Sequence, residues 1–545
     1  MREDFYQGRG FWRLFLEPVL DGFVLLLVVI VPVLTLKKKL GGSSQHEQRH
    51  GRRTKGPELL SAFRWNRKTK PDGICLQLRW QNDLLDSCSK LLPEWASPNF
   101  RIRRNLEASH ILLMGDTGSG KSSAIRQILR QIAERGESAI VYDPALEFTP
   151  EFYSPGRGDL ILNPLDSRCP YWDIADEVST AEAATAMAAA LFPEKEYEKE
   201  FFTDAPRRIF ARLMRQRPSP QDLVRWMSDP AEIERQVQGT PYAALLDRGA
   251  PAQRSGILSS FNMIADSFEL LPRQEEGRAS FSSALWQFER NKWVFLTSKP
   301  TFREKVLPLH SVWLDMLILR MMEPCVNTAK PVWFVLDELA SLNKLPQLHT
   351  AVTENRKSGN PVVLGFQGRS QLEKRYGKDA EAMLSQPATK IFLKTSEPHA
   401  AKWIADAIGE IEIERVKESR SAGLIRSEKQ YTMEVTTKPL VMASEIAGLE
   451  PLHGYIKQEN RVVPVRFPYV APMTKQPGFI ELTMSLASRP IVVQQAVPNP
   501  LPAVAATPVE PPKKPVKKQG IFPGTSQQKA LNEEPSTWDE SEWIE

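Results

Sequence analysis

Cysteine is scarce in this sequence of 545 residues. The four cysteines, Cys75, Cys88, Cys169 and Cys325, lie far apart and form neither a C-x-x-C pair nor a cluster with histidine. Structural zinc sites and disulfide frameworks both require grouped cysteines, so the sequence supports neither of them. Most of the chain is therefore expected to be a reduced, cytosolic protein.

The sequence also lacks a strong charge of either sign. Its formal net charge is +5 and its pI is about 8.8, which is a mildly basic balance. This balance permits a nucleic-acid partner but does not by itself indicate one. Hydrophobic residues make up 41% of the chain, enough for a buried core, and the length suffices for several domains.

Long hydrophobic runs are absent with one exception, Val19–Leu36, which is interrupted by Asp21, Gly22 and Pro32. The run is just long enough to span a bilayer, and the three lysines that follow it indicate that the later chain lies in the cytoplasm. A cleavable signal peptide or a buried core helix would not require these lysines. The sequence therefore predicts a short non-cytoplasmic N-terminus (1–18), a transmembrane anchor (19–36) and a basic linker (37–72).

One glycine-rich stretch carries the strongest functional signal. The apolar segment His110–Met114 runs into G-D-T-G-S-G-K-S, which fits the nucleotide-binding pattern G-x-x-x-x-G-K-S. An amphipathic helix follows and Gly136 stands at its expected end, before the apolar run Ser138–Tyr142 that would complete a βαβ unit. A turn without a ligand is the alternative, but strand, loop and helix in register favour a phosphate-binding loop. Lys121 would contact the β- and γ-phosphates of ATP, and the Ser122 hydroxyl would bind Mg²⁺. The residues expected to bind nucleotide are Gly115, Asp116, Thr117, Gly118, Ser119, Gly120, Lys121, Ser122 and Ser123.

Apolar strands and helices alternate along most of the remaining chain. Near-continuous apolar runs such as Val332–Glu338 and Pro361–Gln367 indicate a parallel sheet that is covered by helices on both faces. Between about Asp173 and Phe288 the sequence changes to alanine-rich, charged helical segments, which are typical of an inserted all-α domain. The expected domains are the first part of a nucleotide-binding domain (73–172), the all-α insertion (173–288), the second part (289–471) and a tail (472–545).

Four further segments complete the interpretation of the chain. Leu345–Ser358 and Ser370–Leu384 are each expected to form one helix, whereas the highly charged stretch Glu410–Lys438 fits no single element. The tail is proline-rich and ends in an acidic stretch with two tryptophans, Glu533–Glu545. It is expected to be disordered, and its end is either a docking peptide or a solubilising tail.

Carboxylates follow one of the predicted strands. Asp337 and Glu338 end the run V-W-F-V-L-D-E, where Asp337 would hold Mg²⁺ and Glu338 would polarise the water that attacks the γ-phosphate. Gln367 ends the next strand, where its amide can reach the γ-phosphate. Each of these residues could instead be a polar group at a strand end, but the glycine-rich loop upstream favours the catalytic interpretation.

Arg356 is the candidate for a residue that acts on a neighbouring subunit. ATPases that convert hydrolysis into motion are commonly rings, in which an arginine from the next subunit completes the site. Arg356 lies in E-N-R-K-S-G, at the predicted end of a helix. Its charge could equally stabilise the C-terminus of its own helix.

The stretch that contains these residues resembles a known family. The segments L-D-E-L-A-S-L-N-K-L-P-Q-L, E-N-R-K-S-G and L-G-F-Q-G-R-S-Q-L-E-K-R-Y-G are similar to those of the TraD/TraG-type coupling proteins of conjugative type IV secretion. The motifs N-P-L-D-S-R and W-V-F-L-T-S are also similar, and the resemblance covers roughly Asn99–Gly454.

The resemblance implies a RecA-like P-loop ATPase that uses ATP and Mg²⁺. It implies a homo-hexamer anchored in the bacterial inner membrane, with single-stranded DNA in its central channel and the all-α domain at the cytoplasmic mouth. The relaxase, relaxosome accessory proteins and the type IV secretion channel are the implied partners. Arg356 matches the family's trans-acting arginine finger and Gln367 its phosphate sensor. The family usually has two transmembrane helices, whereas this sequence shows one good span.

Two alternatives remain open. An FtsK/HerA-like pump for double-stranded DNA would have the same core and a different substrate. A receptor that binds ATP only to assemble, and recruits secreted proteins, would not need Lys121, Asp337 and Glu338 together. DNA-stimulated ATP turnover separates the enzymes from the receptor, and the preferred form of DNA separates the two enzymes.

Overall fold

The computed structural model describes residues 52–69, 72–80, 98–194, 200–289, 291–322, 330–422 and 427–482. The chain divides into two units, Met1–Thr483 and Met484–Glu545, and all described residues belong to the first. The predicted anchor at 19–36 and most of the predicted tail lie outside the described residues. Within the described ranges, no helix has both the length and the apolar character needed to cross a bilayer.

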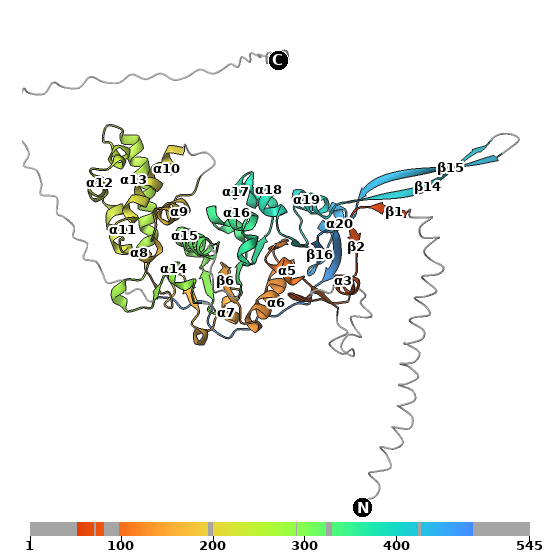
Figure 1. Cartoon of the computed structure of the whole chain (residues 1–545), viewed down its shortest axis with the longest axis horizontal. Helices are drawn as coiled ribbons and strands as arrows, with labels where there is room; N and C mark the ends of the chain where they lie inside the picture. The colour runs from red at the N-terminus through yellow and green to blue at the C-terminus, as the bar shows by residue number, and fades with distance from the viewer. Residues whose placement is uncertain are drawn as a thin grey trace, which may run out of the picture. The chain divides into compact units, whose positions relative to one another are not determined.

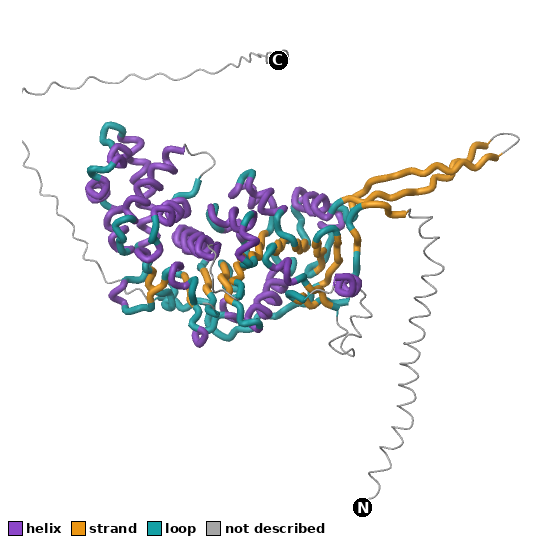
Figure 2. Tube along the Cα trace, in the orientation of Figure 1, coloured by secondary structure: helices purple, strands orange, loops and turns teal. Residues whose placement is uncertain are grey.

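Ten strands of the described chain form one central sheet (Figures 1 and 2). In spatial order they are β7 (Leu160–Leu162), β10 (Val294–Thr297), β6 (Ser138–Asp143), β11 (Val332–Leu336), β12 (Val362–Phe366), β5 (Ile111–Met114), β13 (Thr389–Leu393), β16 (His453–Gln458), β17 (Arg461–Arg466) and β2 (Glu58–Leu59). The strands from β7 to β13 are parallel, which confirms the predicted sheet, and β16 is antiparallel to both of its neighbours. β5 and β6 are joined by one helix, but β12 and β11 lie between them.

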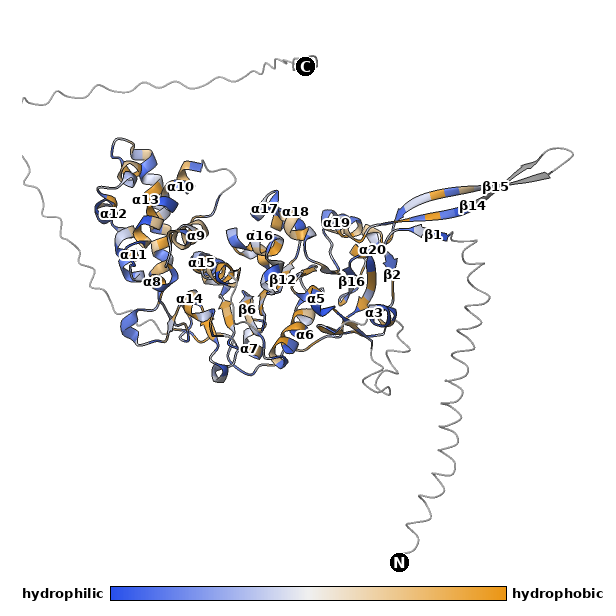
Figure 3. Cartoon of the chain, in the orientation of Figure 1, coloured by the Kyte–Doolittle hydropathy of each residue, from blue (hydrophilic) through white to orange (hydrophobic). Residues whose placement is uncertain are grey.

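Helices cover both faces of the sheet. Side chains alternate between the faces along each strand, so Leu113 packs with Ile128 of α6 (Lys121–Glu134), while Leu112 belongs to the core on the opposite face. Figure 3 shows hydrophobic strands between helices whose outer surfaces are hydrophilic. Several helices contribute side chains to the core on the Leu112 face. They include α15 (Arg303–Met322), α16 (Pro346–Thr353), α17 (Arg369–Tyr376), α18 (Asp379–Ser385), α19 (Pro398–Ile408) and α20 (Ala443–Ala447).

Two segments that were predicted as single helices are interrupted. α16 ends at Thr353, and the short 3₁₀ helix η8 (Asn355–Ser358) follows it. α17 and α18 are separated at Gly377, whose φ of 55° and ψ of −130° do not belong to a helix. Glycine tolerates this conformation because it has no Cβ.

Helices make up most of the segment predicted as an all-α insertion, but its two ends are joined by a short sheet. β8 (Tyr171–Trp172) pairs in parallel with β9 (Ser280–Phe281). The buried Glu177 carboxylate accepts hydrogen bonds from Trp172 Nε1 (2.9 Å) and Ser283 N (2.7 Å), which ties the two ends together. The helices are α8 (Ile174–Glu177), α9 (Ala181–Leu191), α10 (Glu200–Met214), α11 (Pro220–Ser228), α12 (Pro230–Val237), η4 (Pro241–Leu246), α13 (Pro251–Phe268), η5 (Gln274–Glu276) and α14 (Ser283–Trp286).

Residues 52–69 were predicted to belong to a basic linker, but they are part of the fold. β2 pairs with β17, and the helix α3 (Ala62–Thr69) contacts the same end of the sheet. The prediction was wrong here because the arginines and lysines of α3 lie on its exposed side, opposite the buried Trp65. The adjoining elements are β1 (Arg52–Lys55), β3 (Cys75–Gln77), β4 (Asn99–Arg101) and α5 (Arg104–Glu107).

Replacing Trp65 with alanine is expected to lower the free energy of unfolding by about 3–5 kcal/mol. The Trp65 ring is fully buried and stacks on Phe100 with 5.1 Å between ring centroids, and its Nε1 donates to Arg101 O at 2.9 Å. Thermal denaturation of the full chain measures the effect. Phe63→Ala is the matched control, because Phe63 lies on the same helix and is 75% exposed. Equal melting temperatures for the Trp65→Ala protein and the wild type would show that α3 does not contribute to the core.

A buried carboxyl group on α15 makes stability depend on pH. Asp315 is fully buried and accepts a hydrogen bond from Gln347 N at 2.9 Å, while its Oδ2 has no partner among the described residues. Burial raises the pKa of Asp315 to about 8. The folded protein therefore keeps this proton between about pH 4 and pH 8 whereas the unfolded chain releases it, so this group lowers stability as the pH rises.

Asp315→Asn is accordingly expected to raise the melting temperature at about pH 8, where the wild-type carboxyl must stay protonated or be buried with a charge. The asparagine oxygen can still accept from Gln347 N, so the gain is at least about 1 kcal/mol at high pH and disappears near pH 4. Melting curves across this pH range test the expectation. A gain of the same size at every pH would mean that ionisation of Asp315 is not its cause.

The charged stretch that fits no single element in the sequence forms an antiparallel ribbon, β14 (Glu410–Ala422) and β15 (Ser427–Pro439). β1 pairs with the base of β14, which makes a sheet of three strands. Ile411 and Ile413 are buried at this base, whereas Met433 and Val435 of β15 are exposed. Figure 2 shows the two strands leaving the end of the central sheet together.

The chain after β17 returns across the loops that follow the parallel strands. We call residues 467–482 the C-terminal strap. Lys475 N and Gln476 N donate to Pro150 O beside α7 (Thr149–Phe152), and Leu482 N donates to Leu165 O beyond β7. The strap includes the residues from 472 to 482, which were predicted to belong to the tail. The remaining short helices are η3 (Pro155–Arg157), η6 (Pro300–Phe302) and η7 (Leu339–Ser341).

Candidate nucleotide-binding site

The glycine-rich loop joins β5 to α6. Gly118 and Gly120 have φ angles of 76° and 114°, which place them in the left-handed region that favours glycine. A Cβ on Gly120 would also lie 2.8 Å from Leu452 Cδ2, and one on Gly115 would lie 2.6 Å from Ser119 Oγ. The turn therefore needs these glycines, and it leaves backbone N–H groups free to face an anion at the N-terminus of α6.

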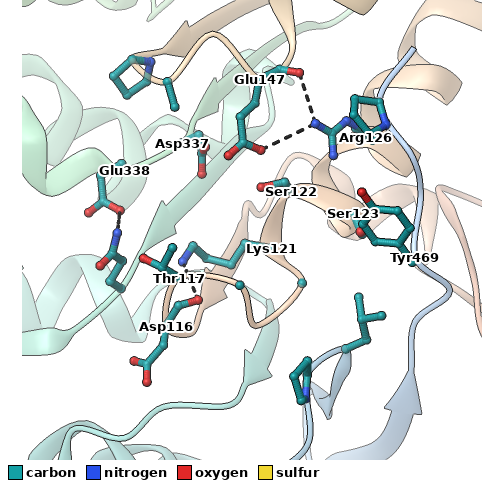
Figure 4. A pocket seen from close by; sticks show the side chains of 18 of the residues that line it. Asp116, Thr117, Lys121, Ser122, Ser123, Arg126, Glu147, Asp337, Glu338 and Tyr469 are labelled. Carbon is teal, nitrogen blue, oxygen red and sulfur yellow. Dashed lines mark hydrogen bonds and ion pairs between the residues drawn. The ribbon is translucent and has the colours of Figure 1, made fainter. Parts of the chain in front are cut away.

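Lys121 stabilises the loop from within. Its ammonium donates to the carbonyl oxygen of Gly115 at 2.5 Å. It also donates to that of Asp116 at 3.2 Å, as Figure 4 shows. Burial lowers the pKa of Lys121, and the nearby carboxylates of Asp337 and Glu338 act in the opposite direction. The lysine is thus positioned at the centre of the loop, where it can interact with a bound phosphate.

The side chain of Asp116 anchors the loop to the neighbouring strand. Its carboxylate accepts hydrogen bonds from Ser396 N (2.7 Å), Ser396 Oγ (2.6 Å) and Thr395 Oγ1 (3.1 Å), just after β13. Burial acts to raise the pKa of Asp116, but these hydrogen bonds outweigh it and the pKa is lowered. The carboxylate of Asp116 therefore holds the loop in place, and its backbone N–H also donates to Lys394 O at 2.8 Å.

The predicted acidic pair lies directly after β11. Asp337 is buried, and its pKa is raised to about 7 by burial and by the carboxylates of Asp143 and Glu147. Burial also raises the pKa of Glu338. Gln367, at the end of β12, donates from Nε2 to Glu338 Oε2 at 2.7 Å (Figure 4).

Glu338 has a left-handed backbone, with φ 61° and ψ 56°. This conformation costs a non-glycine residue about 1–3 kcal/mol and persists only where the surroundings enforce it. Ser341 Oγ donates to Glu338 O at 2.8 Å and lies 2.8 Å from the Tyr142 hydroxyl, so a chain of hydrogen bonds holds the residue. The strained backbone therefore belongs to the residue whose carboxylate was predicted to activate water.

Strand order explains why these residues meet. β11, β12 and β5 are adjacent and parallel, so their carboxyl ends place Asp337, Gln367 and the glycine-rich loop at one edge of the sheet. The three groups surround a cavity of about 570 Å³. Its lining consists of Asp116, Thr117, Gly118, Gly120, Lys121, Ser122, Ser123, Arg126, Pro144, Ala145, Glu147, Arg303, Asp337, Glu338, Gln367, Pro451, Leu452, Tyr469 and Pro472.

Several lining residues were not predicted from the sequence. Arg126 lies one turn into α6 and forms ion pairs with Glu147 and Glu151 at 3.6 Å each. Arg303 begins α15 and donates to Pro144 O at 2.8 Å. The sequence held a signal for Arg303, which lies shortly after the motif W-V-F-L-T-S. It held none for Tyr469, which is far from every motif.

Arg356 lies in η8, beyond α16. Its backbone position agrees with the predicted end of a helix, and its side chain is not among those that the structure describes. The role of Arg356 as a trans-acting arginine is therefore a prediction, argued in the Discussion.

A family model described as "Type IV secretion-system coupling protein DNA-binding domain" matches residues 96–468. This match covers more than half of the chain. The chain belongs to this family of coupling proteins. The resemblance predicted from the sequence is thereby confirmed.

Curated relatives agree with this assignment. The coupling protein is 29% identical over 414 residues to the coupling protein TraD of Escherichia coli (strain K12), an alignment that covers 73% of this chain and 55% of TraD. It is 30% identical over 115 residues to the conjugal transfer protein TraG of Rhizobium radiobacter, over 21% of this chain and 18% of that protein. The chain thus spans about half of the length of TraD.

Solved structures share the fold. The unbound form of the bacterial conjugative coupling protein TrwBdeltaN70 superimposes with a TM-score of 0.67 at 24% identity, over 79% of this chain and 97% of that chain. TrwB in complex with ADP and Mg²⁺ gives a TM-score of 0.66 at 23% identity, over 79% of this chain and 98% of that chain. The described part of this coupling protein therefore has the α/β fold of TrwB, with a mainly parallel central sheet.

Proposed function

We propose that this coupling protein hydrolyses ATP and uses the energy to move single-stranded DNA, with its attached relaxase, into a type IV secretion channel. The observation that carries the proposal is the convergence of Lys121, Asp337 and the Gln367–Glu338 pair on one cavity. A site that only binds nucleotide needs the glycine-rich loop but not a carboxylate held in a strained conformation beside it. The family to which the chain belongs, described as a type IV secretion-system coupling protein DNA-binding domain, supports DNA as the molecule that is moved.

Magnesium fits the donors that the cavity offers. Ser122 and the buried Asp337 both line it, and Mg²⁺ prefers one or two protein oxygens together with phosphate oxygens and water. The described residues include no group of three or more His, Cys, Asp or Glu side chains that could hold a metal ion. Most ligands would therefore come from the nucleotide and water. When bound, Mg²⁺ neutralises charge on the phosphates.

The side chains of the cavity divide the remaining work. The Lys121 ammonium donates to carbonyl oxygens of its own loop, and from this position it neutralises charge on the β- and γ-phosphates of a bound nucleotide. The Glu338 carboxylate accepts the proton of the attacking water, and Gln367 holds this carboxylate in place. The raised pKa of Glu338 suits a group that must take up a proton.

Assembly and location complete the proposal. We infer a homo-hexamer, in which Arg356 of one subunit reaches the phosphate bound by the next, and an anchor at 19–36 in the bacterial inner membrane. Relaxosome proteins on one side and the secretion channel on the other would be its partners.

ATP hydrolysis by the full chain tests the proposal, measured with single-stranded DNA, with duplex DNA and without DNA over a range of protein concentrations. We expect turnover to rise with protein concentration as rings form, and to rise further with single-stranded DNA. Stronger stimulation by duplex DNA would favour an FtsK/HerA-like pump. ATP binding without turnover under all conditions would favour a recruitment receptor.

A further inference from the structure

The C-terminal strap lies against the glycine-rich loop. Leu452 N, just before β16, donates to Ser119 O at 2.8 Å, and Phe467 N donates to Leu452 O at 2.8 Å. Further along the strap, Val470 N donates to Ser123 Oγ at 3.4 Å. These bonds attach the strap to the loop and to the first turn of α6, although more than 300 residues separate the two in the sequence.

Tyr469 is the residue of the strap that faces the cavity. It lines the same cavity as Lys121 and Glu338, yet 70% of its surface is exposed. An aromatic side chain so exposed at the mouth of a ligand cavity has no evident packing role. Among the described residues, no aromatic ring stacks on it.

The order of groups along the cavity indicates what Tyr469 could contact. Figure 4 shows Glu338 at one end, Lys121 and Ser122 in the middle, and Tyr469 beside Ser123 at the other end. A P-loop lysine contacts the β- and γ-phosphates, and the hydrolytic carboxylate lies beyond the γ-phosphate. The α-phosphate, sugar and base must therefore extend away from Glu338, toward Ser123 and Tyr469.

We propose that Tyr469 is a stacking platform for the nucleobase, with Leu452 and Pro451 forming the adjoining apolar wall of the subsite. This inference rests on the proposed nucleotide-binding function and adds the part of the site that holds the base. The Leu452 side chain packs directly against Gly120, in the space that a Cβ on this glycine would occupy, and so connects the apolar wall to the glycine-rich loop. The strap thus links the base to the phosphate loop through the hydrogen bonds described above.

The chemistry of the subsite predicts little discrimination between purines. Pro451, Leu452, Tyr469 and Pro472 line the cavity together with Ser123 and Arg126, which Figure 4 shows near Tyr469. The charge of Arg126 is compensated by Glu147 and Glu151, and the residues of the strap and of the turn before β16 offer no side-chain amide or carboxylate to the edge of a base. Apolar contacts and stacking accept any flat base, whereas discrimination requires directed hydrogen bonds. ATP and GTP should therefore bind with dissociation constants that agree within about tenfold.

Calorimetric binding to the full-length protein tests the platform without requiring turnover or DNA. The probes are ADP, GDP and inorganic tripolyphosphate, which has no base. Tyr469→Ala is expected to weaken the binding of ADP and GDP by between about fivefold and about 100-fold, which is the usual loss when a stacking side chain is replaced by alanine. The binding of tripolyphosphate should stay unchanged. Tyr469→Trp should bind ADP as well as the wild type or better, because it preserves the aromatic face.

Phe63→Ala is the control, because it removes an exposed aromatic residue from α3 and should not change the binding of any probe. Unchanged ADP binding by Tyr469→Ala would overturn the proposal. Equal losses for ADP and tripolyphosphate would also overturn it, because the tyrosine would then act on the loop and not on the base. These outcomes differ from a failure of the proposed function. A protein that binds nucleotide without hydrolysing it would still show this binding pattern, whereas a protein that binds no nucleotide would bind none of the probes.

Discussion

Replacing Arg356 with alanine is expected to reduce ATP turnover by about 10³–10⁵-fold while nucleotide binding stays near normal. This is the effect of removing an arginine that stabilises charge on the transferred phosphoryl group from across a subunit boundary. If Arg356 only stabilised the end of its own helix, the change would cost under about 1 kcal/mol of stability and leave turnover intact. Lys357→Ala is the matched control, since it removes an exposed cation from the same 3₁₀ helix.

Mixing two inactive variants gives a sharper test of the ring. Arg356→Ala subunits keep an intact Lys121, and Lys121→Ala subunits keep an intact Arg356. Some interfaces in a mixed hexamer would combine an intact loop with an intact arginine, so part of the activity should return when the proteins are mixed. A stable Arg356→Ala protein with wild-type turnover would exclude a trans-acting arginine at this position.

Glu338→Gln is expected to reduce turnover by about 10²–10⁴-fold, because the amide cannot accept the proton of the attacking water. The substitution keeps the shape of the side chain and an oxygen that can accept from Gln367, so the fold and ATP binding should be preserved. Rates of phosphate release and the dissociation constant for ATP are the two measurements. Glu373→Gln, which changes a carboxylate on α17 that pairs with Arg369, is the control.

Wild-type turnover by the Glu338→Gln protein would assign water activation to another group. Loss of ATP binding together with turnover would instead indicate that Glu338 supports the loop. Only turnover lost with binding retained agrees with the proposed role.

The parts of the fold that could be predicted from the sequence are those encoded locally. β5, the glycine-rich loop and α6 follow one another without a gap; Gly118 and Gly120 are required by their backbone conformation, and the apolar residues of β5 and α6 by their burial. Asp337, Glu338 and Gln367 were each predicted from their positions at the ends of apolar strands, together with the glycine-rich loop upstream. The structure supplies the strand order, β11 next to β12 and β12 next to β5, that brings these residues to one edge of the sheet.

The parts that could not be predicted depend on contacts between distant segments. Tyr469 reaches the cavity only because the strap crosses the loop, and no local pattern indicates that path. The ribbon of β14 and β15 alternates apolar and polar residues only in short stretches, such as Glu410–Glu414 and Tyr431–Val435, and the charged residues between them obscured this strand signal. Residues 52–69 were mistaken for a linker because a single buried tryptophan carries the packing of α3.

The pairing of the first described strands has a consequence for biosynthesis. Leu59 of β2 pairs with Val462, and Arg53 of β1 pairs with Ile413, so both strands find their partners about 350–400 residues later in the chain. At roughly 5–20 residues per second, a ribosome needs on the order of 20–80 s to make this stretch. During that interval β1 and β2 remain without their partner strands, so translation must proceed past β17 before the sheet can close at this end.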